Sequence, residues 1–178
     1  MKPLVRGAAL LVLIAATQGV GADANLEGHW RWWDQPGRGE RFIARTPSLI
    51  FADSFLLVYF DARKNCAPFL ALAFEPANPQ DRPPAEYALG QQLEVRVDDA
   101  EPVRFLTAVS ARAGNQHYVV HPLSPNLLEA ISAGTRLLAR AAFAPQTDLF
   151  SLRGSAVSLR RQRALCRDHH RKQTRNAP

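Results

Sequence analysis

Short segments in which apolar and polar residues alternate make up most of the chain, and turn-forming residues separate them. Gln92–Val97 is the clearest of these segments, because every second residue is apolar: Leu93, Val95 and Val97. Alternation with period 2 places these three side chains on one face of a strand. Further segments are rich in β-forming residues: His29–Asp34, Leu49–Phe51, Phe55–Phe60, Phe69–Phe74, Val103–Val109, His117–Val120, Arg136–Phe143 and Leu149–Leu152. The pattern predicts a mainly β protein.

Two segments have helical rather than strand-like patterns. In SPNLLEAISAG, Ser124 suits the N-cap, Pro125 the first helical position and Gly134 the position after the end. The second helix is predicted from about Ser155 to Cys166, with Leu159 and Cys166 on one apolar stripe. Together the segments predict an antiparallel β-sandwich or barrel-like sheet with two short helices.

The first residues have the composition of a signal peptide. Lys2 and Arg6 form a positive start, Ala8–Ala16 is apolar but too short to span a bilayer, and Val20-Gly21-Ala22 supplies small residues before a cleavage site. An uncleaved anchor or a buried helix is the alternative. We predict cleavage before Asp23, which places the mature chain in the periplasm as a soluble protein. The remaining length suits a single domain with its own core.

Charge is distributed unevenly along the chain. The formal net charge of +6 is concentrated near the C-terminus, where one acidic residue, Asp168, accompanies seven basic ones: Arg160, Arg161, Arg163, Arg167, Arg171, Lys172 and Arg175. We therefore expect residues 1–22 to be a signal peptide, 23–166 a single β-rich domain, and 167–178 a basic, disordered tail.

Cys66 and Cys166 are the only cysteines. An oxidising compartment favours a bond between them, whereas a reactive thiol would need a catalytic-looking neighbourhood that neither has. The predicted disulfide closes a loop of about 100 residues, which the chain-entropy model values at about 4–5 kcal/mol.

Three tryptophans lie close together in the first predicted strand. Trp30 and Trp32 share one face and Trp33 points to the other. They could form a stacking platform for a glycan such as peptidoglycan, or they could anchor the core. Because aromatic side chains dominate the packing of small domains, the core is the favoured interpretation.

Other chemistry finds little support in the sequence. His117 and His121 would lie about 13 Å apart along a strand, too far to share one metal ion. Asp98, Asp99 and Glu101 form an acidic turn without the interleaved ligands of a calcium loop. The sequence contains no G-x-S-x-G elbow and no glycine-rich phosphate loop. We therefore predict no cofactor, no metal and no catalytic residues.

The arginine-rich end is the remaining candidate for binding. Nucleic acid is a poor fit, because the chain is predicted to be exported and the basic residues lack interleaved aromatic side chains. Contact with an acidic partner or with anionic lipid headgroups fits better. The residues predicted for this contact are Arg160, Arg161, Arg163, Arg167, Arg171 and Lys172.

Several short motifs together resemble known families. They are Gly28-x-Trp30, a mid-chain cysteine at Cys66, the G-x-x-L-x-V-R-V-D-D strand at Gly90–Asp99, the L-x-x-R strand at Leu137–Arg140, and F-S-L-x-G-S-A-x-x-L…C at Phe150–Cys166. This order resembles small periplasmic proteins of the type VI secretion-associated TagO/VasI kind and the invasion-associated locus B proteins, over most of the mature chain. The resemblance implies an exported β-sandwich with a disulfide and no catalytic residues.

These observations lead to two hypotheses about function. The first is a periplasmic, non-enzymatic accessory protein that binds another protein of the envelope or of a secretion system. The alternative is a module that binds a glycan or anionic lipid through the tryptophan cluster and the basic tail.

Overall fold

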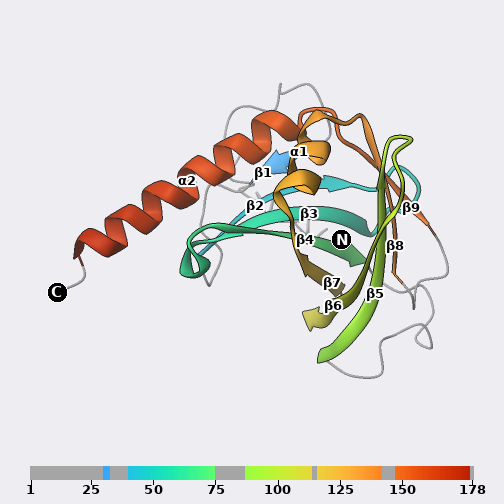
Figure 1. Ribbon diagram of the computed structural model, residues 1–178, viewed down its shortest axis with the longest axis horizontal. Coiled ribbons are helices and arrows are strands. Elements are labelled where there is room, and N and C mark those ends of the chain that lie inside the picture. Colours follow the sequence, from blue (N-terminus) through green and yellow to red (C-terminus); the bar gives the residue numbers. More distant parts are fainter. Residues whose placement is uncertain (1–29, 33–39, 75–86, 114–115, 142–146, 177–178) are drawn as a thin grey trace, which may run out of the picture.

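The computed structural model describes residues 30–32, 40–74, 87–113, 116–141 and 147–176 (Figure 1). The predicted signal peptide lies outside these residues, as does Trp33. No helix in the described parts of the chain carries an apolar stretch long enough to cross a membrane.

Within the described residues, nine antiparallel strands form one sheet in the order β1-β2-β3-β4-β7-β6-β5-β8-β9. The strands are β1 (Arg31–Trp32), β2 (Arg41–Pro47), β3 (Ser54–Asp61), β4 (Ala67–Phe74), β5 (Tyr87–Val97), β6 (Val103–Ala113), β7 (Gln116–Pro122), β8 (Arg136–Ala141) and β9 (Asp148–Ser151). Two α-helices, α1 (Pro125–Ala133) and α2 (Ser155–Asn176), and a 3₁₀ turn, η1 (Ala62–Lys64), complete the described fold. The predicted mainly β, antiparallel architecture with two helices is confirmed.

The sheet curls until its last strand reaches the end of β2. Phe150 of β9 forms an isolated antiparallel bridge with Ser48, and the Leu49 backbone N–H donates to the Leu149 carbonyl at 2.8 Å. The Ser48 hydroxyl also donates to the Asp148 carboxylate. These contacts join β9 to the end of β2 at a single point instead of along a ladder, so the sheet is barrel-like without being a closed barrel.

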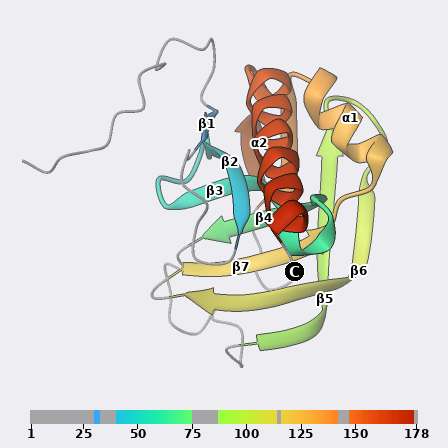
Figure 2. The same ribbon diagram turned by 90° about the vertical axis from the view of Figure 1, so that its left-hand side faces the viewer.

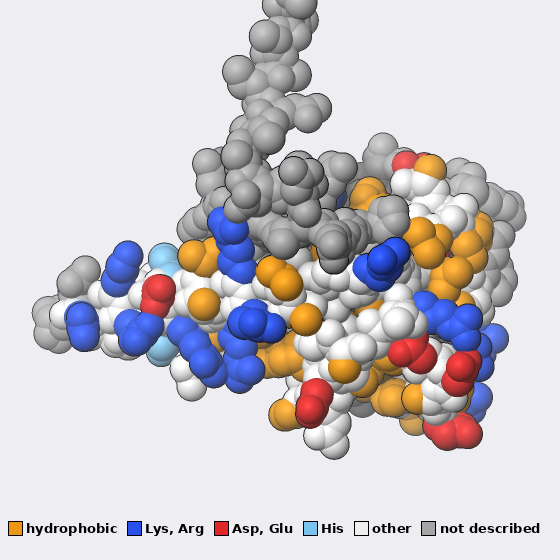
Figure 3. Space-filling view, turned by 90° about the horizontal axis from the view of Figure 1, so that it is seen from above, with side chains coloured by type: hydrophobic (Ala, Val, Ile, Leu, Met, Phe, Trp, Pro, Cys, Tyr) orange, Lys and Arg blue, Asp and Glu red, His pale blue; other side chains and the backbone are white. Residues whose placement is uncertain are grey.

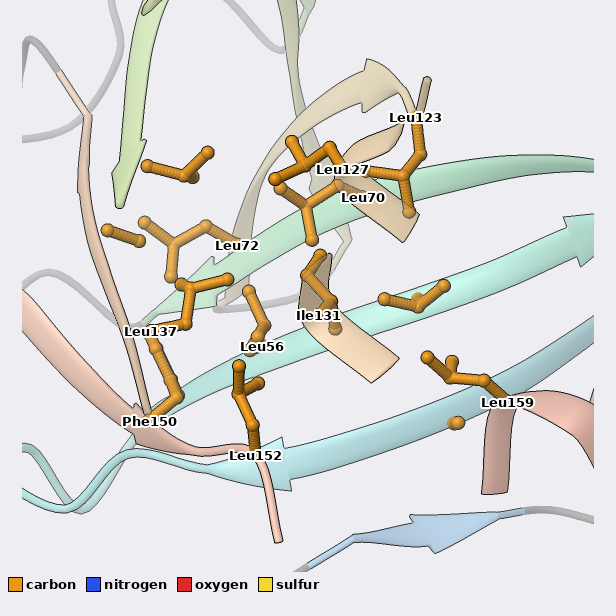
Figure 4. Packing of buried hydrophobic residues seen from close by; sticks show 14 of the residues in the cluster. Leu56, Leu70, Leu72, Leu123, Leu127, Ile131, Leu137, Phe150, Leu152 and Leu159 are labelled. Carbon is orange, nitrogen blue, oxygen red and sulfur yellow. The ribbon is translucent and has the colours of Figure 1, made fainter. Parts of the chain in front are cut away.

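The core fills the inside of this curled sheet (Figure 4). As the alternation in Gln92–Val97 predicts, Leu93, Val95 and Val97 are buried while Gln92 and Arg96 are exposed. Helix α1 adds Leu127 and Ile131 to the same core. One continuous apolar cluster thus connects both halves of the sheet to the helices.

Helix α1 begins and ends where the sequence predicts. The Ser124 hydroxyl accepts a hydrogen bond from the Leu127 backbone N–H at 3.3 Å, which is an N-cap. Gly134 ends the helix for a reason that the sequence does not reveal. A Cβ atom there would lie 2.6 Å from Val97 Cγ1 and 2.9 Å from the Ala130 carbonyl oxygen. The residue is glycine because β5 and the helix backbone approach it closely.

Two parts of the sheet differ from the sequence-based prediction. Leu49–Phe51 is not a strand, because the Ser48 side-chain oxygen accepts hydrogen bonds from the Ile50 and Phe51 backbone N–H groups, each at 2.9 Å, and bends the chain. Conversely, β2 was not predicted, since its arginines and its proline mask the alternation of buried Phe42 and Ala44 with more exposed neighbours.

Helix α2 is longer than predicted. It passes Cys166 and continues to Asn176, through residues that the sequence led us to expect as a disordered tail. Figure 1 shows its C-terminal end extending past the strands. Figure 2 shows that the same helix runs beside α1 and passes β1 and β2. Helix α2 contacts all three of these elements.

Candidate functional site

The disulfide fixes the middle of α2 to the turn between β3 and β4. Cys66 and Cys166 are bonded, with Cα atoms 5.9 Å apart, as the sequence predicts. Asp61 shapes the turn that presents Cys66: its carboxylate accepts from the Arg63 backbone N–H at 3.0 Å, and its carbonyl accepts from the Cys66 N–H at 2.8 Å. Helix α2 therefore has a covalent anchor on a hydrogen-bonded turn.

The face of α2 that packs on the body is unusually polar. Ser155 donates from its hydroxyl to the Ile131 carbonyl of α1 at 2.8 Å, and Leu159 and Cys166 are buried beside it. Gln162 is completely buried, yet its amide oxygen and nitrogen have no hydrogen-bond partner among the described residues. The hydroxyl of buried Ser158 likewise lacks a partner there. Because several buried positions on this face are polar, apolar packing holds the helix less strongly than it would hold a helix of this length with an apolar face.

Contacts to β2 hold the C-terminal part of α2. The His169 ring lies 5.5 Å from the Phe42 ring, centroid to centroid, and its Nε2 lies 3.8 Å from the Glu40 carboxylate. The Gln173 side-chain amide donates to the same carboxylate. These contacts explain why the residues after Cys166 continue the helix.

The opposite face of α2 carries the basic residues, which we call the cationic face. Its exposed members are Arg160, Arg163, Arg167, Arg171, Lys172 and Arg175, and Arg161 is partly exposed. Asp168 is the one acidic residue of α2 and pairs with Arg171. Figure 3 shows basic side chains along the helix where it leaves the body. The six residues that the sequence singled out for an anionic partner thus lie on one helix.

The tryptophans do not form a described surface cluster. Trp30 is 3% exposed, and its indole N–H donates to the Ser151 carbonyl at 2.9 Å, which ties the chain before β1 to β9. A stacking platform needs an exposed ring face, and the Trp30 ring lies in the core. The side chain of Trp32 and all of Trp33 lie outside what the structure describes.

The two histidines of β7 make different ring contacts. His117 is buried and stacks on Phe74 with ring centroids 6.1 Å apart, whereas His121 stacks on Phe105 at 4.0 Å. Across the described ranges, no three His, Cys, Asp or Glu side chains gather as metal ligands would.

The acidic turn after β5 holds the start of β8. Asp98 accepts hydrogen bonds from the Thr135 hydroxyl at 2.5 Å and from the Arg136 backbone N–H at 2.9 Å. The Thr135 hydroxyl contributes most to holding the pKa of Asp98 below its ordinary value. Asp99 forms an ion pair with Arg136 at 2.7 Å. Asp98 and Asp99 therefore have structural roles, because both bind residues at the start of β8.

Sequence analysis missed a second, smaller cluster of buried apolar residues, on the opposite side of the sheet from the main core. Tyr59, Phe69 and Ala71 form a separate apolar cluster away from the main core. The signal for it was present in the runs FLLVYF and FLALAF, which are apolar at nearly every position and so supply both faces of their strands.

A comparison with solved structures finds a similar fold. The chain resembles the crystal structure of invasion associated protein B from Bartonella henselae, with a TM-score of 0.54 and 15% sequence identity, over 78% of this chain and 94% of that chain. No model of a known protein family matches the sequence, and no curated protein matches it either. The comparisons thus give no support to the TagO/VasI part of the resemblance. They show that this chain shares a fold with invasion associated protein B.

Proposed function

We propose that this protein is an exported, non-enzymatic accessory protein that binds another protein of the cell envelope through the cationic face of α2. The fold shared with an invasion-associated protein gives weak support to an envelope role. The signal-peptide pattern at the N-terminus and the disulfide support export.

The observation that carries the proposal is the rigid presentation of the cationic face. Its basic residues follow one another at helical spacing, and the disulfide and the Gln173–Glu40 hydrogen bond fix the helix on either side of Arg167 and Arg171. A fixed array of like charges loses little conformational freedom on binding and steers an oppositely charged partner toward it.

An acidic protein surface fits this face better than a lipid bilayer does. A helix that inserts at a membrane surface needs an apolar side directed at the lipid. In α2, Leu159 and Cys166 point into the core, and Leu165 packs against it. Arginine on the opposite side suits bidentate pairing with carboxylates.

Site-specific crosslinking in the native envelope tests the proposal. A photoreactive amino acid replaces Ala164, which is exposed among the arginines of the helix. We expect a crosslink to one envelope protein that carries an acidic patch. The crosslink should weaken at high salt, because the Debye length shrinks from about 8 Å at 0.15 M to about 3 Å at 1 M.

Charge reversal supplies the specificity control. The triple change Arg160→Glu, Arg163→Glu and Arg167→Glu should reduce the crosslink about tenfold or more, since it replaces attraction with repulsion. Arg96→Glu, on the exposed face of β5, should leave it unchanged. A crosslink that survives the triple change and high salt would contradict binding through this face.

Anionic lipid remains the second candidate, because the same cations would attract phosphate headgroups. Each basic residue near such a surface contributes about 1 kcal/mol. Co-sedimentation of the mature protein with phosphatidylglycerol vesicles separates the two. We expect weak binding at physiological salt, and tight binding that the triple change abolishes would favour lipid over protein.

A further inference from the structure

The outward side of α2 follows a seven-residue repeat. From Val157 to Thr174, exposed residues recur along one line of the helix at alternating intervals of three and four positions. We call these residues the heptad seam: Val157, Arg160, Ala164, Arg167, Arg171 and Thr174. Buried Gln162 and Cys166 lie on the other side of the helix. Alternating intervals of three and four are the spacing by which one helix packs along another in a coiled coil.

The two core positions of this repeat carry different side chains. One position holds Val157 and then Ala164, and the other holds Arg160 and then Arg167. Val157 is 44% exposed although it is apolar, and Ala164 is small enough to let another backbone come close. An arginine can lay its aliphatic stem across such a contact while its guanidinium reaches the edge. The seam therefore combines apolar contact with charge.

The seam arginines are not paired within the described chain. Among the described residues, no acidic side chain forms an ion pair with Arg160 or Arg167, nor with Arg163 beside the seam. On the sheet, by contrast, Arg104 pairs with Glu94 at 2.6 Å. The guanidinium groups of the seam are therefore available for the carboxylates of a partner.

We infer that the heptad seam docks an acidic α-helix of the partner protein. In this contact, Asp or Glu of the partner faces Arg160 and Arg167, and apolar side chains face Val157 and Ala164. Each heptad of the partner helix thus carries an acidic residue at one core position and an apolar residue at the other, whichever way that helix runs. The inference rests on the proposed function for its acidic envelope partner, and it adds the secondary structure and the residue spacing of the partner's contact segment.

Two other occupants fit the seam poorly. From Val157 to Thr174 the helix carries six basic residues and one acidic residue, so a second copy of this chain would bring like charges together. An extended segment repeats its side chains about every 6.6 Å on one face. The seam repeats about every 5 Å along the helix, so an extended segment soon falls out of step with it.

Binding of synthetic peptides to the mature, oxidised protein tests the seam. The heptad peptide carries, over several heptads, glutamate at one core position and leucine at the other. Its control has the same composition and charge, but its leucines recur at every second residue. We expect fluorescence anisotropy to show that the heptad peptide binds at least about tenfold more tightly than the control. Circular dichroism should show that the heptad peptide gains helicity as it binds.

Val157→Lys separates docking along the seam from simple charge attraction. The change adds a cation to α2 but removes the exposed apolar side chain from the seam. Docking of a helix predicts that the heptad peptide binds about fivefold more weakly, whereas charge attraction alone predicts tighter binding. Val103→Lys on β6 is the matched control, because Val103 is 42% exposed and Val157 is 44% exposed. The control should leave the affinity unchanged.

The possible results distinguish the inference from the proposed function. Equal binding of the two peptides by the native protein, or tighter binding of the heptad peptide by Val157→Lys, would overturn the inference. If both peptides bind equally and the triple change to glutamate abolishes both, the cationic face binds acidic chains of any spacing and the proposed function stands.

Binding of neither peptide also overturns the inference, and the crosslink from residue 164 then decides the proposed function by itself. Preference for the heptad peptide without any envelope crosslink retains the seam and contradicts the envelope partner. The comparison of the two peptides uses the native protein, so it does not depend on the folding of a variant.

Discussion

Cys66 and Cys166 are separated by 100 positions in the chain and joined by a disulfide that fixes α2 to the turn between β3 and β4. Both cysteines are buried in the main core. The helix face around Cys166 offers buried Gln162 and Ser158 where a helix usually offers apolar side chains. The disulfide therefore holds α2 on the body where apolar packing is limited.

Loss of this bond should lower the free energy of unfolding. We expect Cys66→Ala with Cys166→Ala to reduce it by about 2–5 kcal/mol, the range for small secreted domains. Urea unfolding followed by circular dichroism measures the loss. A reductant should destabilise the native protein to a similar extent and leave the double variant unaffected. Two thiols that titrate in the denatured, unreduced native protein would contradict the disulfide.

Replacement of Gln162 by Leu should raise stability. Burial of the Gln162 amide removes its hydrogen bonds to water, and no hydrogen bond to the described residues replaces them. Because an apolar side chain of similar size loses no such hydrogen bonds on folding, leucine avoids this desolvation cost. We expect the free energy of unfolding to increase by about 1–2 kcal/mol. Gln92→Leu, at an exposed position of β5, is the control and should change it by less than about 0.5 kcal/mol. A large loss of stability in Gln162→Leu would show that the amide is bonded.

Gly134→Ala should destabilise the fold although alanine is a good helix former. The added Cβ would lie 2.6 Å from Val97 Cγ1 and 2.9 Å from the backbone carbonyl oxygen of Ala130. The carbonyl cannot rotate away as a side chain could, so helix and strand must separate. Overpacking of this kind costs about 1–3 kcal/mol. Thermal unfolding measures the cost, and Ala133→Gly, at the exposed last residue of α1, serves as the control for helix propensity alone.

Acid should weaken the turn that carries Cys66. Burial raises the pKa of Asp61, but its hydrogen bonds with Arg63 and the charge of Arg41 outweigh burial and hold the pKa below its ordinary value of 3.8. A carboxyl group whose pKa is lower in the folded protein stabilises it above the unfolded pKa, and this contribution is lost as the pH falls through the folded pKa.

The native protein should therefore be more stable than Asp61→Asn at pH 7, and the difference should shrink below about pH 4. Urea unfolding at several pH values measures it. Arg63→Ala removes the main partner and should make the pH dependence shallower. A difference between native protein and Asp61→Asn that stays constant from pH 7 to the acid range would contradict the role of the ionised carboxylate.

Structural features that depend on short stretches of sequence were predicted correctly. The alternation in Gln92–Val97 set which side chains of β5 enter the core, and Ser124 set the start of α1. The disulfide followed from there being two cysteines in a chain predicted to be exported. These features depend on local periodicity, on capping chemistry or on a count, and none requires knowledge of distant contacts.

Other features depended on residues far apart in the chain, and only the tertiary structure decided them. The basic segment after Cys166 is helical because His169 and Gln173 meet Phe42 and Glu40 of the β2 region, which no local pattern relates to them. Trp30 lies in the core, as the sequence favoured, but only the tertiary structure shows that its indole N–H donates to the Ser151 carbonyl of β9. The sequence by itself determined that the chain forms strands, two helices and a disulfide. The curling of the sheet and the docking of α2 decided which side chains share a surface, because shared surfaces arise from strand register and helix docking across the whole chain.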